Sequence, residues 1–132
     1  MDPVLDALRQ QLSTALGLPV AVGSPAAPGT GLLLWPWRIA EIEGTRMRPP
    51  SRGGVEVAPA RPRVCLSVLV LSADGTASLC KALAWASANP LLPVGERSAS
   101  LRRQQLSAEE LAAIFATAGI ALAPALCWDI ED

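Results

Sequence analysis

The stretch RVCLSVLVLSA, residues 63–73, decides the fold class of this chain. Valine and leucine occupy both sets of alternating positions, so a strand formed here has two apolar faces. Such a strand needs a covering layer on each face, which is typical of a strand inside a sheet that carries helices. We therefore expect residues 63–73 to form the buried central strand of a sheet.

The segments that follow this strand predict one helix and one exposed strand. Residues 76–88 carry an apolar stripe at helical spacing, and the helix is stopped by Asn89 and Pro90. Residues 91–98 contain proline and glycine and are expected to be a connection. Residues 100–106 are polar, which indicates an exposed strand.

A capping box then marks the third helix. In SAEE, residues 107–110, a serine precedes a glutamate by three positions, so the two side chains can satisfy free backbone amides at a helix start. The helix closes at Gly119. Residues 125–132 alternate, as expected of a half-buried or edge strand. One face of this last strand carries Leu126, Trp128 and Ile130, and the other carries Cys127, Asp129 and Glu131.

Upstream of the central strand, the pattern predicts a helix and two strands. Asp2 is a candidate N-cap with proline at the first helical position, and the apolar stripe of this helix ends at Gly17. Residues 18–22 can form a short strand. Residues 31–43, GLLLWPWRIAEIE, predict a long strand in which Pro36 implies a bulge or a sheet edge, because proline cannot donate to the ladder.

These elements together predict one α+β domain over residues 1–132. The expected order is α-β-β-β-α-β-α-β, with a mixed sheet of four to five strands and three helices. A mass of 13.7 kDa is enough for one hydrophobic core and leaves no room for a second domain.

The segment TRMRPPSRGGVEVAPARP, residues 45–62, is expected to be a long exposed loop. It is rich in proline, glycine and arginine and holds little that a core would bury. Its basic residues are Arg46, Arg48, Arg52 and Arg61. Two interpretations remain open, a solvated linker and a contact to an acidic partner surface.

Charge and residue usage exclude several function classes. Lys plus Arg is 11 and Asp plus Glu is 12, so no basic excess favours nucleic acid or an anionic membrane. The chain has no His and no Tyr, which removes the usual nucleophile pairs and imidazole metal ligands. We therefore predict that the protein is not an enzyme and has neither a metal nor a cofactor. The cysteines, Cys65, Cys80 and Cys127, are widely spaced in apolar runs and are expected to be buried free thiols.

An apolar composition points to an assembly rather than to a membrane. Hydrophobic residues make up 51% of the chain and charged residues 17%, so we expect a partner to cover some apolar surface. Residues 111–128 lack charge over nearly a membrane-spanning length, but Gly119 and Pro124 interrupt them and acidic residues flank both ends. The first residues do not resemble a signal peptide, and we expect a cytoplasmic protein.

An ordered series of motifs resembles a known family. The series is RIAEIE, a proline-rich gap, RPRVCLSVLVLSAD, a helix, LSAEELAAIFATAG and PALCWDIED. It is similar, over nearly the whole chain, to the N-terminal domain of tail cap proteins from extracellular contractile injection systems of the Photorhabdus virulence cassette type. The segment WPW, residues 35–37, departs from the family pattern.

This resemblance implies a structural protein without catalysis or cofactor. Related proteins, like phage tail terminators, form a ring that seals the sheath and inner tube at the end distal to the baseplate. The implied partners are copies of the chain itself, in a ring expected to have six subunits, and the sheath and tube proteins. The particles would assemble in the cytoplasm and be released by lysis.

Charge and aromatic residues suggest where contacts lie. A basic loop and an acidic last strand on one subunit suit head-to-tail packing in a ring. The predicted interface residues are Trp35, Trp37, Arg46, Arg48, Arg52, Arg61, Trp128, Asp129 and Glu131. The alternative is a monomeric adaptor that binds a peptide through the exposed tryptophans or an edge strand.

Overall fold

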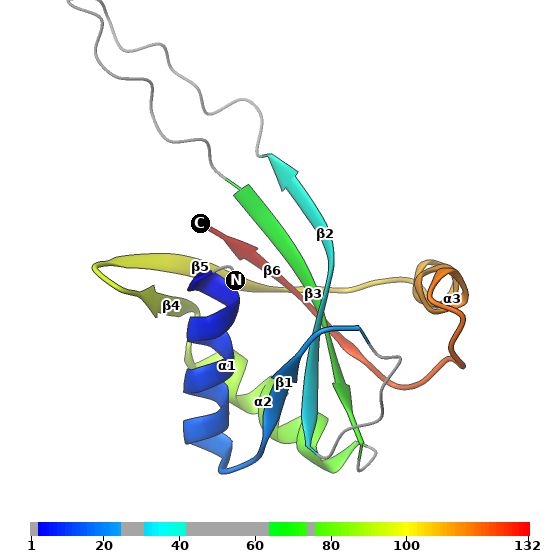
Figure 1. Cartoon of the computed structure of the whole chain (residues 1–132), viewed down its shortest axis with the longest axis horizontal. Helices are drawn as coiled ribbons and strands as arrows, with labels where there is room; N and C mark the ends of the chain where they lie inside the picture. Colours follow the sequence, from blue (N-terminus) through cyan, green and yellow to red (C-terminus); the bar gives the residue numbers. More distant parts are fainter. Residues whose placement is uncertain (1–2, 25–30, 42–63, 74–75) are drawn as a thin grey trace, which may run out of the picture.

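The sheet is built around β3, Val64–Ser72, as the sequence predicts (Figure 1). The computed structural model describes residues 3–24, 31–41, 64–73 and 76–132. Within these residues the sheet has six strands in the order β1-β2-β3-β6-β5-β4. The other strands are β1 (Val20–Val22), β2 (Leu32–Glu41), β4 (Leu91–Val94), β5 (Arg97–Gln104) and β6 (Leu126–Glu131). The helices are α1 (Pro3–Leu16), α2 (Ala77–Ala88) and α3 (Ala108–Thr117).

The predicted α+β class and mixed sheet are confirmed, with a higher strand count. β1 and β2 are parallel, and every other neighbouring pair is antiparallel. Residues 91–98 are not a plain connection, because they form β4 and the start of β5 around a two-residue turn at Gly95 and Glu96. Pro93 is compatible with β4 because this strand lies at the edge of the sheet.

Of the two positions expected for the last strand, half-buried or at an edge, the edge position is wrong. β6 pairs with β3 on one side and with β5 on the other, so it is an inner strand. The prediction that Trp128 and Ile130 share one face is nevertheless confirmed, since both side chains are buried on the same side of the strand. Alternation identifies which residues share a face and carries no information about strand order.

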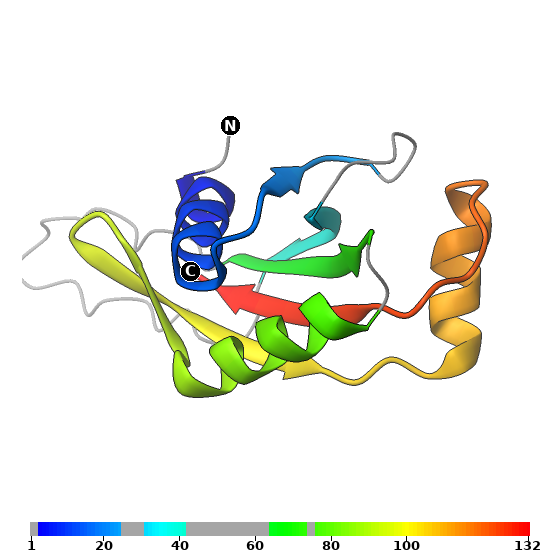
Figure 2. The ribbon, with the colours of Figure 1, turned by 90° about the horizontal axis from the view of Figure 1, so that it is seen from below.

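Side chains on both faces of β3 pack in hydrophobic clusters, one on each side of the sheet. Val68 and Val70 belong to the larger hydrophobic cluster, which includes residues of α1 and α2. Leu69 and Leu71 face the other way and pack with Phe115 of α3 in a smaller cluster. Figures 1 and 2 show α1 and α2 on one side of the strands and α3 at the far end on the other side. The predicted two-sided burial of this strand is confirmed.

Pro36 lies at a bulge in β2, as predicted. The register between β2 and β3 shifts between Pro36 and Arg38. β1 pairs only with Leu32–Leu34 on the outer side of β2. In the described part of the chain, the rest of β2 therefore has a strand neighbour on one side only.

The predicted helix starts agree with the structure where they are described. Ser107 is the N-cap of α3, and its Oγ accepts a hydrogen bond from the amide of Glu110 at 3.1 Å. α1 buries Val4, Leu8 and Leu12 along its predicted stripe, while its candidate cap Asp2 lies outside the described residues.

The three thiols differ in exposure, which corrects the expectation that all are buried. Cys127 is buried, Cys65 is half-buried and Cys80 is exposed on α2. Burial raises the pKa of the Cys127 thiol to about 11, an effect opposed by the neighbouring indole of Trp37.

Gly31 lies directly before Leu32, where the pairing of β1 with β2 begins. Its φ is +91°, and a Cβ at this position would collide with the carbonyl oxygen of Pro19, which accepts a hydrogen bond from Leu32 at 3.0 Å.

We predict that Gly31→Ala lowers the free energy of unfolding by at least about 3 kcal/mol, through backbone strain and the collision. Gly17→Ala is the matched control, because Gly17 also has a positive φ but open space around it, and should cost about 1 kcal/mol. Equal losses in denaturant melts would show that the collision with Pro19 does not occur.

The thiols should differ in reactivity in the folded protein. At pH 8 a thiol with a pKa near 11 is ionised in about one molecule in a thousand, and only the thiolate attacks iodoacetamide. We expect Cys80 to be alkylated first and Cys127 last, as followed by mass spectrometry of digested samples. Denatured protein, in which the three rates should converge, is the control. Equal rates for Cys80 and Cys127 in the folded protein would contradict the burial of Cys127.

Candidate interaction surface

Trp35 and Trp37 lie half-buried between β2 and α3. Both pack against the smaller hydrophobic cluster, and the ring of Trp35 meets that of Phe115 edge to face at 6.1 Å between centroids. The buried Nε1 of Trp37 has no oxygen acceptor within the described residues and lies beside the Cys127 thiol. These tryptophans therefore attach α3 to the sheet and leave only part of their surface for a partner.

Trp128 lies in the core rather than at the surface. Its side chain is 0% exposed, and its ring is 6.2 Å from that of Trp85 on α2. The apolar face of β6 turns toward the layer formed by α1 and α2. With its side chain fully buried, Trp128 cannot act as an exposed aromatic anchor, and we leave it out of the proposed interface.

The acidic residues of the last strand already have partners inside the chain. Asp129 accepts a hydrogen bond from the Ser67 hydroxyl at 2.7 Å, and Glu131 is ion-paired with Arg102. Asp132 pairs with Arg97 at 2.8 Å. The expectation that these carboxylates are free to meet a partner is corrected, because the inner position of β6 places them beside side chains of β3 and β5.

The same carboxylates affect the nearest thiol. Burial, followed by the negative charges of Asp129 and Glu131, raises the pKa of Cys65. Cys65 is therefore a poor nucleophile near neutral pH. This arrangement of a thiol beside carboxylates does not suit nucleophilic catalysis, which needs a lowered thiol pKa.

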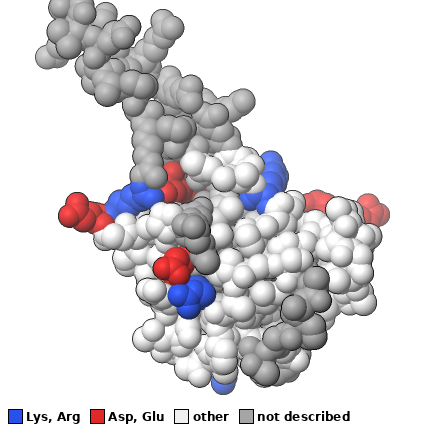
Figure 3. Space-filling view, in the orientation of Figure 1, with Lys and Arg blue, Asp and Glu red and all other residues white. Residues whose placement is uncertain are grey.

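The four arginines of residues 45–62 lie outside the described residues. Their role in an interface stays a prediction from the sequence. On the face seen in Figure 3, most charged side chains lie in one band, and below it the surface is mainly white, with one adjacent acidic and basic pair and one basic group at the lower edge.

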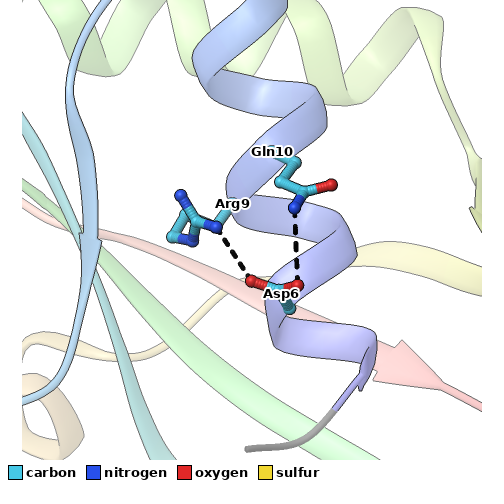
Figure 4. Close-up of polar contacts among 3 residues, drawn as sticks. All are labelled: Asp6, Arg9 and Gln10. Atoms are coloured by element: carbon cyan, nitrogen blue, oxygen red, sulfur yellow. Dashed lines mark hydrogen bonds and ion pairs between the residues drawn. The ribbon is translucent and has the colours of Figure 1, made fainter.

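The charged groups of α1 are paired with each other. Arg9 donates to Asp6 at 2.9 Å, and the amide of Gln10 donates to the same carboxylate at 3.5 Å (Figure 4). Opposite charges one helical turn apart neutralise each other at the surface. The outer side of α1 is therefore a polar but nearly neutral surface.

A groove that sequence reasoning missed lies at the end of β5. It has a volume of about 670 Å³ and is lined by residues of α2, β5, β6 and the start of α3. We call it the β5 groove. Its lining includes Leu83, Arg102, Arg103, Leu106, Leu111 and Leu126. The polar run at residues 100–106 predicted an exposed strand, but the apolar walls come from segments that are distant in sequence.

Neither a group of metal ligands nor a membrane-spanning helix is found in the part of the chain that the structure describes. Among the described residues, no three Cys, Asp or Glu side chains are placed to hold a metal ion. No described helix is both long enough and apolar enough to cross a bilayer.

Comparison with known proteins identifies the fold. No protein-family model matches the chain, and no curated protein matches it. Among solved structures, it is similar to an extracellular contractile injection system's PVC sheath/tube terminator, determined by cryo-EM in the extended state. The TM-score is 0.66 at 17% sequence identity, and the match covers 98% of this chain and 54% of the other, so this chain spans about half of that protein's length. The chain thus has the fold found in a sheath/tube terminator, as its sequence motifs suggest.

Proposed function

We propose that this domain is a terminator subunit of a contractile injection particle. In this role it forms a ring that ends the sheath and inner tube at the end distal to the baseplate. The observation that carries the proposal is the likeness of fold over 98% of the chain to a protein described as a sheath/tube terminator. The motif resemblance in the sequence supports the same assignment.

The surface of the subunit is compatible with contacts on several sides. Within the part of the chain that the structure describes, three large apolar side chains are strongly exposed, Ile39 at 69%, Leu91 at 62% and Leu122 at 58%. They lie on β2, on β4 and after α3, at separate places in the fold. A ring needs two different faces that fit each other, and side chains at separate places in the fold could contribute to different faces. The proposed ring has six subunits, the number that the resemblance implies.

The proposed role is structural and needs no cofactor. The proposed partners are other copies of the chain and the sheath and tube proteins, and assembly takes place in the cytoplasm before the particle is released by lysis. Residues proposed for these contacts are Trp35, Trp37, Arg46, Arg48, Arg52, Arg61, Asp129 and Glu131, of which the two acids would act together with their partners Ser67 and Arg102.

The open side of β2 favours a second candidate function. In the described residues β2 lacks an outer neighbour after Leu34, and a peptide can add to such an edge as a strand. A monomeric adaptor that binds a peptide beside Trp35 and Trp37 would use this edge. Such an adaptor would be found throughout a lysate rather than at particle ends.

Removal of the protein tests the terminator role. We expect particles made without it to have sheaths and tubes of irregular length, because nothing would stop their growth at the distal end. Negative-stain images of particles made with and without the protein give the length distribution. Particles of normal, uniform length in its absence would contradict the role, and restoring the gene controls for effects on neighbouring genes.

The arginines of residues 45–62 provide a more local test. Changing Arg46, Arg48 and Arg52 together to Ser should impair incorporation into particles, more so at higher salt, because charge pairs at an interface act mainly through association. The melting temperature should change little, since exposed pairs contribute about 0 to 1 kcal/mol. Wild-type incorporation would show that the loop is only a linker, and a collapsed melting temperature would show that these arginines support the fold.

A further inference from the structure

The outer edge of β5 is open beyond its pairing with β4. The β4–β5 ladder ends at Leu91 and Ser100. β5 continues to Gln104 on its other side, where it pairs with β6. Figure 2 shows β4 joining α2 while β5 runs on toward α3. No strand within the described residues pairs with this outer edge of β5.

The backbone of Arg103 is turned toward this open side. The amide of Leu101 donates to the carbonyl of Pro90 at 2.9 Å, so Leu101 faces the β4 side of the strand. In an antiparallel sheet, the N–H and C=O of one residue point the same way, and residues two apart point alike. Arg103 therefore presents its N–H and C=O outward, where a further strand would pair with them.

The β5 groove surrounds this part of the edge. Leu83 of α2 lines it from one layer, and Leu106 and Leu111, at the start of α3, line it from the other. All three side chains are half-buried, so each keeps apolar surface open to the groove. A volume of about 670 Å³ lies between them. An extended chain lying along β5 would thus meet an apolar wall on each of its faces.

The charge of the β5 groove indicates which kind of segment it can bind. Arg102 and Arg103 line it, and the side chain of Arg102 is 66% exposed although it pairs with Glu131. No acidic residue is among the described lining residues, but Glu131 pairs with Arg102, and Glu110 and Asp129 lie near the lining thiol of Cys127, so the positive charge that remains for a partner is that of Arg103. The basic residues 45–62 of a second copy have the wrong charge for this site, and the acidic strand β6 is already inside the sheet. Charge complementarity therefore favours an acidic segment from a different protein.

We propose that the β5 groove binds an extended acidic segment of a partner protein, which adds as a strand beside Arg103. Backbone hydrogen bonds to Arg103 fix its register. Alternate side chains of an added strand point to opposite faces, so its apolar side chains pack on one wall of the groove and its acidic side chains lie near Arg103. This inference goes beyond the terminator role and does not depend on it.

Peptide binding to the full chain tests the proposal. The probe is a capped peptide of about eight residues that alternates glutamate and valine, long enough to extend past the open edge of β5 at both ends. Its matched control carries lysine in place of glutamate. We expect the acidic peptide to bind with a Kd below about 1 mM by calorimetry, the range of weak strand addition, and the basic peptide to bind at least about tenfold more weakly.

Two substitutions of Arg103 distinguish the contribution of its backbone N–H to binding from that of its charge. Arg103→Gln keeps the N–H and should weaken binding by about fivefold, the size expected of one exposed charge pair. Arg103→Pro also removes the outward N–H and should weaken binding by at least about tenfold. Lys81→Gln is the control, because Lys81 is exposed on α2 and outside the lining of the groove, and should bind like wild type. Circular dichroism melts verify that each variant is folded.

Hydrogen exchange gives a readout without any substitution. The amide of Arg103 should exchange at least about tenfold more slowly when the acidic peptide is bound. The proposal is overturned by absence of binding at about 1 mM, by equal binding of both peptides, or by an unchanged Arg103 amide. Self-association of the chain that Arg103→Pro abolishes would also overturn it, because the occupant would then be a second copy.

Discussion

The two apolar faces of β3 are the constraint on which the rest of this structure depends. Val68 and Val70 point one way and Leu69 and Leu71 the other, and each is 9% exposed or less. A strand of this kind is stable only between two layers. α1 and α2 build a large layer on one side, whereas the layer on the other side is small, since Phe115 is the one buried residue of α3. The half-buried tryptophans of β2 complete this thinner layer.

The part of the fold that depends on local pattern could be predicted from the sequence. The two-sided apolar run of β3, the Ser107 cap of α3 and the interruption of β2 at Pro36 each follow from residues close together in the chain. Strand order could not be predicted in this way, because it is decided by contacts between distant segments. The alternation of β6 therefore could not distinguish an inner half-buried strand from an edge strand, and β4 was missed because an edge position tolerates Pro93.

The candidate site was less predictable than the fold for the same reason. Sequence spacing cannot show that Glu131 and Arg102 are neighbours on adjacent strands, or that Trp128 faces a helix layer. Because the carboxylates of β6 are paired inside the chain, backbone edges and apolar side chains become important among the features available for contacts. The open edges of β2 and β5 and the exposed Ile39, Leu91 and Leu122 are such features. Edges and side chains of this kind are features that a neighbouring chain can cover, by strand addition or by apolar contact.

A cryo-EM map of whole particles is the sharpest test of the terminator role proposed for this domain. If the account is right, density for this domain forms a closed ring at the baseplate-distal end, in contact with the last layer of both sheath and tube. The six-stranded sheet and the two unequal helix layers should fit that density without change of topology. A distal end whose ring is formed by another protein, with this domain elsewhere or missing from the particle, would contradict the account.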